Sequence, residues 1–132
     1  MDLEIGFKKN KEGVLTISLT GSLDSDTHAE CDKKIQDALA DKNIKALVFD
    51  LQGLDYISSI GFSLIFKTKK AMEQKGCAFA ITNVQPNIKK IFDAVKVIPF
   101  ENMDEVDEYL DKYIDSMSRR GKKENPDDNS RK

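Results

Sequence analysis

The sequence has few of the residues that commonly carry catalysis or bind metals. It has no tryptophan and one histidine, His28, which we interpret as a surface residue. The cysteines, Cys31 and Cys77, form no CxxC pair, and with one histidine they cannot complete a standard zinc site, so we read them as core residues. The phosphate-binding patterns GxxxxGK[ST] and GxGxxG are absent. We therefore expect no catalytic residue, no metal and no cofactor.

Long hydrophobic runs are also missing. No segment approaches the roughly 18 to 20 apolar residues that a membrane span requires. The first four residues, Met-Asp-Leu-Glu, are acidic and show no secretory signal. The formal net charge of -2 lacks the basic bias of a nucleic-acid-binding domain. We expect a cytoplasmic protein with neither a nucleic-acid partner nor a membrane span.

The sequence does have alternating strand and helix patterns, and 39% hydrophobic residues, which suit one domain core. Period-two alternation predicts strands near 3–7 and 14–19, joined as a hairpin. Apolar runs predict further strands at 46–49, 77–82 and 97–98. Helical periodicity predicts four helices, near 27–40, 58–75, 86–95 and 102–115. This order predicts an α/β fold: a mixed sheet with parallel central strands and an N-terminal hairpin, with about four helices packed on it.

Helix ends and the domain boundary follow from local chemistry. Thr27 with Glu30, and Asn102 with Glu105, have the spacing of capping boxes. The predicted edge strand at 97–98 is closed by a proline. Residues 116–132 are rich in charge and poor in apolar side chains, so they cannot bury enough surface to offset their ordering entropy. We therefore predict a domain over residues 1–115 and a disordered charged tail over 116–132.

One segment, from Tyr56 to Phe66, has the features of a functional site. Ser58 and Ser59 lie where a helix is predicted to begin, and either can be its N-cap. The free amide groups and the dipole at a helix N-terminus favour an added negative charge, so the fold would tolerate a phosphate on Ser59. The alternative is that both serines only cap the helix. Phe62 and Phe66 share one helix face, which is either buried or exposed to a partner.

These residues also carry a resemblance. Residues 3–115 resemble a STAS domain of the bacterial anti-sigma factor antagonist type. The segment 19–24, Leu-Thr-Gly-Ser-Leu-Asp, is similar to the strand-end pattern apolar-x-Gly-Glu-Leu-Asp of that family. The segment 50–62, Asp-Leu-Gln-Gly-Leu-Asp-Tyr-Ile-Ser-Ser-Ile-Gly-Phe, is similar to the family loop Asp-Leu-x-x-Val-x-Phe-Met-Asp-Ser-Ser/Thr/Ala-Gly-Leu. The segment 83–93 resembles the stretch before the last parallel strand of that family.

The resemblance implies a partner-switching regulator of transcription. In this family the phosphorylated serine stands two residues before the glycine, which here makes Ser59 the acceptor before Gly61. It implies two partners, an anti-sigma factor that is a serine kinase of the GHKL type and a phosphatase of the PP2C type. The implied partner surface comprises Asp24, Thr27, Ser58, Ile60, Gly61, Phe62 and Phe66. The alternative is a STAS subunit of a lipid-transport or sensory complex that is not phosphorylated.

Overall fold

A computed structural model describes the backbone of residues 2–124 and the side chains as far as Tyr113. Its strands are β1 (Leu3–Lys9), β2 (Val14–Leu23), β3 (Ala46–Ile57) and β4 (Ala78–Thr82). Its helices are α1 (His28–Leu39), α2 (Ser59–Gln74), α3 (Pro86–Ala94) and α4 (Met103–Glu124). Within this part of the chain, no helix has the combination of length and hydrophobicity needed to cross a bilayer.

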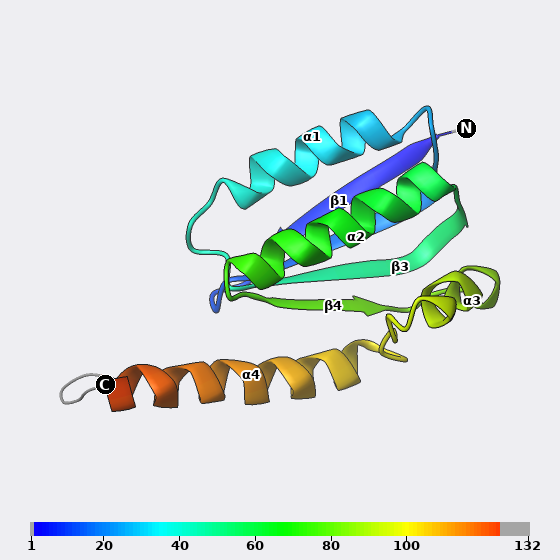
Figure 1. Cartoon of the computed structure of the whole chain (residues 1–132). Coiled ribbons are helices and arrows are strands. Elements are labelled where there is room, and N and C mark those ends of the chain that lie inside the picture. Colours follow the sequence, from blue (N-terminus) through cyan, green and yellow to red (C-terminus); the bar gives the residue numbers. More distant parts are fainter. Residues whose placement is uncertain (1, 125–132) are drawn as a thin grey trace.

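The four strands form one sheet in the order β1-β2-β3-β4. Strand β1 is antiparallel to β2, whereas β2, β3 and β4 run parallel to one another. The predicted mixed sheet with an N-terminal hairpin is therefore confirmed. Figure 1 shows α1 and α2 together over one face of the sheet and α4 on the opposite side, along β4. The parallel arrangement brings the carboxyl ends of β2 and β3 to the same edge, where α2 begins.

Each face of the sheet has its own hydrophobic core, because side chains alternate along a strand. On the first face, Leu47 and Phe49 of β3 pack with fully buried residues of α1, α2 and α3, among them Ile35, Ile65 and Phe92. On the second face, a smaller cluster joins the alternate residues of β2, β3 and β4 to α4; it comprises Val14, Ala46, Val48, Ala78, Ala80, Val106 and Leu110. Helices α2 and α3 are thus fixed on the same side of the sheet.

The segment between α3 and α4 corrects one prediction. Residues 97–98 do not form a strand, and Ile98 is 70% exposed. The backbone turns at Lys96, whose φ is 63°, so residues 97–98 cannot continue in line with the sheet. Pairing occurs later, at Phe100, which forms an isolated parallel bridge with Thr82 and donates its N–H to the carbonyl oxygen of Ile81 at 2.8 Å.

Helix α4 begins as predicted but ends later. Asn102 caps it, because its side-chain oxygen accepts the N–H of Glu105 at 3.0 Å. The helix then continues to Glu124, so the backbone of residues 116–124 is helical where the sequence predicted disorder. This stretch, residues 116–124, contains lysine, arginine and glutamate, which favour helix, and it contains no proline. The rest of the predicted tail, residues 125–132, lies outside the described residues.

Candidate functional site

The start of α2 is held against the end of β2 by a backbone hydrogen bond. The N–H of Ser58 donates to the carbonyl oxygen of Leu23 at 2.9 Å. Leu23 also stands opposite Ile57 in the parallel register of β2 and β3. The loop that begins at Asp24 is therefore brought to the same edge of the sheet as Ser58 and Ser59. Two segments that lie far apart in the sequence therefore meet here.

Ser58 is the N-cap of α2, which confirms one of the two predicted caps. Its backbone is extended, with φ -89° and ψ 173°, and its hydroxyl accepts the N–H of Gly61 at 3.2 Å. The first helical hydrogen bond follows, from the N–H of Phe62 to the carbonyl oxygen of Ser58 at 2.8 Å. Because Ser58 alone caps the helix, Ser59 is left as the first residue of α2 without a capping role.

Ser59 is exposed, and its hydroxyl has no hydrogen bond to any residue whose side chain or backbone the structure describes. The N–H groups of Ser59 and Ile60 precede the first helical hydrogen bond, so they lack an acceptor within the helix. Exposed amide groups at this end of a helix attract anions, and the helix dipole adds to the attraction. The hydroxyl of Ser59 is thus accessible and lies where a negative charge is stabilised.

Gly61 is buried where α2 comes closest to β2. A Cβ atom at this position would stand 2.4 Å from the carbonyl oxygen of Leu23 and 2.8 Å from its Cγ atom. Real Cβ atoms do not approach other heavy atoms this closely, so glycine permits the contact. Gly61, two residues after Ser59, therefore has a packing role, since it lets the start of α2 lie directly on the end of β2.

Asp24 and Thr27 shape the loop between β2 and α1. The Asp24 carboxylate accepts the N–H groups of Asp26 at 2.9 Å and of Thr27 at 3.1 Å. The Thr27 hydroxyl accepts the N–H of Asp24 at 3.0 Å and donates to the carbonyl oxygen of Ser22 at 2.9 Å. Both polar groups are therefore engaged in holding the loop beside the site, and both side chains are half-buried.

The capping box predicted for Thr27 and Glu30 is wrong. Thr27 is the N-cap of α1, but its side chain makes no capping hydrogen bond. Its backbone is in the helical region, with φ -108° and ψ -15°, whereas a capping residue is normally extended. The hydroxyl instead turns back toward β2, which means that Thr27 stabilises the loop rather than the first turn of the helix.

The apolar residues of the first turns of α2 divide between core and surface. Ile60 is 43% exposed. Phe62 is half-buried, and its ring lies 5.2 Å from that of buried Phe92 in α3 and 6.2 Å from that of Phe66. Phe66 is also half-buried, with the ammonium group of Lys70 5.3 Å from its ring centre. Phe62 is thus attached to the core, while Ile60 presents its side chain to solvent.

Two further apolar residues near this edge are exposed. Tyr56, close to the end of β3, is 49% exposed, and Ile91 of α3 is 38% exposed. The buried residues of α3 are Ile88 and Phe92, so Ile91 lies outside the buried stripe of this helix. The N-terminus of α3 is tied to β3, because the Asn87 side-chain amide donates to the carbonyl oxygen of Asp55 at 3.2 Å.

The described residues offer no metal centre, since no group of three histidine, cysteine, aspartate or glutamate side chains among them is arranged to hold an ion. Around Ser59 the described residues present an exposed surface. An exposed serine starts a helix on the edge of a mixed sheet, flanked by an ordered loop and by exposed apolar side chains. This combination defines a small α/β domain with an exposed serine at the N-terminus of a helix.

The comparison with known families agrees with this architecture. The STAS domain model matches residues 8–116, so the chain belongs to the STAS domain family. The anti-sigma F factor antagonist of Paenibacillus polymyxa is 28% identical to this chain over 93 residues, which cover 70% of this chain and 79% of that protein.

Solved structures share the fold. An anti-sigma factor antagonist from Mycobacterium paratuberculosis superposes with a TM-score of 0.70 at 21% identity, covering 79% of this chain and 90% of that one. The Bacillus cell fate determinant SpoIIAA in its phosphorylated form gives a TM-score of 0.66 at 16% identity, covering 80% and 99% of the two chains. The same antagonist unphosphorylated gives 0.66 at 17% identity, covering 81% and 97%.

Proposed function

We propose that this protein is an anti-sigma factor antagonist that changes partners when Ser59 is phosphorylated. The observation that carries the proposal is that the two serines at the start of α2 have different roles. Ser58 caps the helix through its hydroxyl, and this leaves the neighbouring Ser59 hydroxyl exposed and without a structural task. An exposed hydroxyl can enter a kinase active site without local unfolding. The similarity to a protein named an anti-sigma F factor antagonist supports the same role.

In this proposal the partners are a serine kinase of the GHKL type that also binds a sigma factor, and a phosphatase of the PP2C type. The unphosphorylated domain binds the kinase through the edge formed by the Asp24 loop and the first turns of α2. Ile60 supplies an exposed apolar contact beside Ser59, and Phe62 supports it from the core. Binding occupies the kinase and releases the sigma factor. The domain acts as a regulator in this scheme and performs no catalysis itself.

Phosphorylation would break this contact without unfolding the domain. A phosphoserine carries about 1.5 to 2 negative charges at neutral pH. At the first position of α2 these charges meet free amide groups and the positive end of the helix dipole, so the helix tolerates them. A partner packed on Ile60 would have to desolvate the same dianion, which is costly unless the partner supplies a matching cation. The fold survives and the complex dissociates.

The proposal is tested by incubating the protein with the GHKL-type kinase of its own cell and ATP, and locating the phosphate by mass spectrometry. We expect a single phosphate on Ser59. The Ser63→Ala variant is the matched control, because Ser63 is an exposed serine four residues further along α2 and should not change the result. Phosphate on Ser58, or none on the protein, would refute the assignment of Ser59.

The switch itself is tested by measuring kinase binding with and without the phosphate. We expect Ser59→Ala to bind whether or not ATP is present. We expect Ser59→Asp to bind poorly, although aspartate reproduces only part of the charge of a phosphate. If the phosphorylated protein binds as tightly as the unmodified protein, partner switching is wrong even where the site is correct. A protein that binds no kinase at all would favour the alternative of a STAS subunit in another complex.

A further inference from the structure

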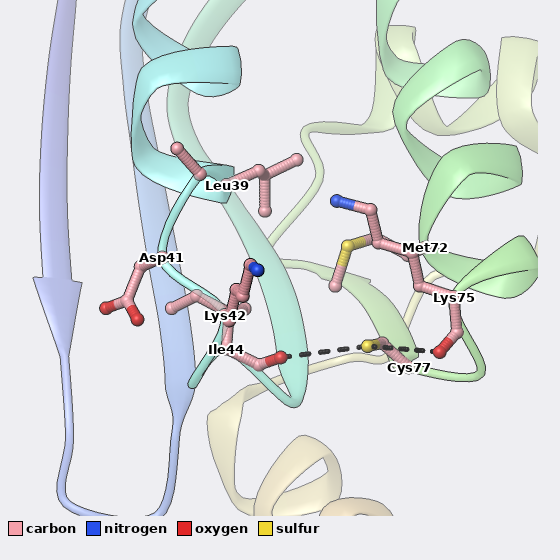
Figure 2. A pocket seen from close by; sticks show the side chains of 8 residues that line it. Leu39, Asp41, Lys42, Ile44, Met72, Lys75 and Cys77 are labelled. Atoms are coloured by element: carbon pink, nitrogen blue, oxygen red, sulfur yellow. Dashed lines mark hydrogen bonds between the residues drawn. The ribbon is translucent and has the colours of Figure 1, made fainter.

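A cavity lies at the end of the domain remote from Ser59. It has a volume of about 380 Å³ and opens between the C-terminal end of α1 and that of α2. Its floor is apolar: Leu39, Ile44 and Met72 line it, and each is at most 8% exposed. Figure 2 shows these side chains around the opening, with the half-buried thiol of Cys77 below Met72. Ligand cavities in proteins usually measure about 300 to 1,000 Å³, so this one suits a small molecule.

Two lysines stand at the opening. Figure 2 shows Lys42 on the α1 side and Lys75 on the α2 side, with both side-chain nitrogens directed toward the space between the helices. Neither ammonium group forms an ion pair with a side chain that the structure describes. Two unpaired ammonium groups at the opening and apolar side chains at the bottom of the cavity together form an amphipathic site.

The one carboxylate in the lining does not neutralise these lysines. Asp41 points away from the cavity in Figure 2, and one of its oxygens accepts a hydrogen bond from the Lys9 ammonium group at 2.6 Å. Its other oxygen accepts the N–H of Asn43 at 2.8 Å. These two hydrogen bonds, that of Lys9 first, lower the pKa of Asp41, so the carboxylate remains charged and engaged outside the cavity.

The C-terminal ends of α1 and α2 carry partial negative charge, which weakens the binding of an anion at this position but does not prevent it. Each helix C-terminus carries roughly half a negative charge, so the two together amount to about one unit. Each of the two lysine ammonium groups carries one full positive charge. Part of the role of Lys42 and Lys75 is therefore to balance the helix dipoles. About one unit of positive charge is left for a ligand.

From this arrangement we infer that the cavity between the ends of α1 and α2 binds a small amphipathic carboxylate, with its hydrocarbon part on Leu39, Ile44 and Met72 and its carboxylate between Lys42 and Lys75. The inference is independent of the proposed function, because it involves none of the residues near Ser59. A neutral apolar molecule would leave both ammonium groups without a counter-charge. An apolar cation would meet two like charges and two helix C-termini of opposite sign, and the full charges outweigh the partial ones.

Sodium octanoate is a suitable probe, since it joins a carboxylate to a short hydrocarbon chain. The full chain, labelled with ¹⁵N, is titrated with octanoate while the amide spectrum is recorded. We expect saturable shifts in the roughly millimolar range that are confined to amides lining the cavity, such as those of Lys42, Ile44 and Cys77. Acetate, which lacks the chain, and octylammonium, which has the opposite charge, should not produce the same saturable shifts.

Matched variants isolate the charges. The double variant Lys42→Gln/Lys75→Gln should bind octanoate about tenfold less tightly, because it loses two modest ion-pair interactions. The control Lys33→Gln/Lys90→Gln removes two exposed lysines outside the cavity and equalises the change in net charge. It should bind like the natural protein. Unchanged affinity in the first double variant, equal binding of octylammonium, or shifts without saturation would each overturn the inference.

Discussion

The carbonyl oxygen of Leu23 lies 2.4 Å from the point where a Cβ atom of residue 61 would stand, so only the hydrogen of Gly61 fits between α2 and β2. Replacement by alanine forces the start of α2 away from the strand end. We predict that Gly61→Ala lowers the free energy of unfolding by about 1 to 3 kcal/mol, the usual cost of overpacking, despite the better helix propensity of alanine.

Urea unfolding measures this change, and Gly6→Ala is the matched control. A Cβ atom at Gly6 would have Ser18 Cβ as its nearest neighbour, at 3.8 Å, which is an ordinary contact. The control should therefore change the unfolding midpoint much less than Gly61→Ala. Equal midpoints for the two variants would show that the close approach of α2 to Leu23 is not required for stability.

The cap of α2 can be tested separately. Ser58→Ala removes the oxygen that accepts the N–H of Gly61. We predict a loss of about 1 kcal/mol in the free energy of unfolding, as is typical for a serine N-cap. Ser63→Ala, on an exposed position within the same helix, should be neutral or slightly stabilising because alanine favours helix. A Ser58→Ala variant as stable as the natural protein would mean that water replaces the cap fully.

Ile60 and Phe62 should behave differently under truncation. Because Ile60 is 43% exposed, we predict that Ile60→Ala leaves stability nearly unchanged but weakens kinase binding by roughly 1 to 3 kcal/mol. Because Phe62 packs on Phe92, Phe62→Ala should cost about 2 kcal/mol of stability. Calorimetric binding and thermal unfolding separate the two effects. Ile98→Ala, at an isoleucine 70% exposed beyond α3, is the control, and a loss of binding equal to that of Ile60→Ala would argue against a specific contact.

The buried thiol of Cys31 makes stability depend on pH in the alkaline range. Burial raises its pKa from 9.0 to about 11. Between these values the unfolded chain has lost the thiol proton and the folded chain has kept it, so the folded state becomes less stable as pH rises from about 9 to 11. We predict that the melting temperature falls over this window by more in the natural protein than in Cys31→Val. Parallel curves for the two proteins would contradict the prediction.

The domain boundary is tested by truncation after Asp115. The anchors of α4 on the sheet, Val106 and Leu110, are 0% and 4% exposed, and the Tyr113 hydroxyl donates to the carbonyl oxygen of Gly76 at 2.8 Å. All three remain in the shortened chain. We therefore predict an unchanged melting temperature for residues 1–115. A drop of several degrees would show that the later residues contribute to folding.

Periodicity along the chain was enough to predict the sheet, the hairpin and the four helices, because side-chain alternation reports directly which face is buried. It failed at residues 97–98, where apolar composition suggested a strand. The left-handed backbone of Lys96, which no pattern of apolar residues reveals, turns the chain there. The end of α4 was also missed, since a lack of apolar residues excludes a core contact but does not exclude a helix made of lysine, arginine and glutamate.

At the candidate site the sequence predicted which segments matter better than it predicted what each side chain does. It allowed Ser58 or Ser59 as the cap, and only the backbone geometry identifies Ser58. It gave Thr27 a capping role that the hydroxyl does not perform, because a hydrogen bond across the loop to Ser22 competes with the first turn of α1. The cavity beside Met72 was not predicted at all, since its lining comes from two separate segments, 39–44 and 72–77, that only the fold brings together.

The bridge between Phe100 and Thr82 limits how far the sheet could extend into an assembly. It occupies the carboxyl end of the outer edge of β4, so a strand added there would find only a short stretch available. The outer edge of β1 is seven residues long and is not covered by a neighbouring strand of the described chain. Two molecules that joined through β1 would leave β4 as the edge strand at both ends of the combined sheet. Because the Phe100 bridge shortens the free edge of β4, association by strand pairing would stop at a dimer and would not continue into a fibre.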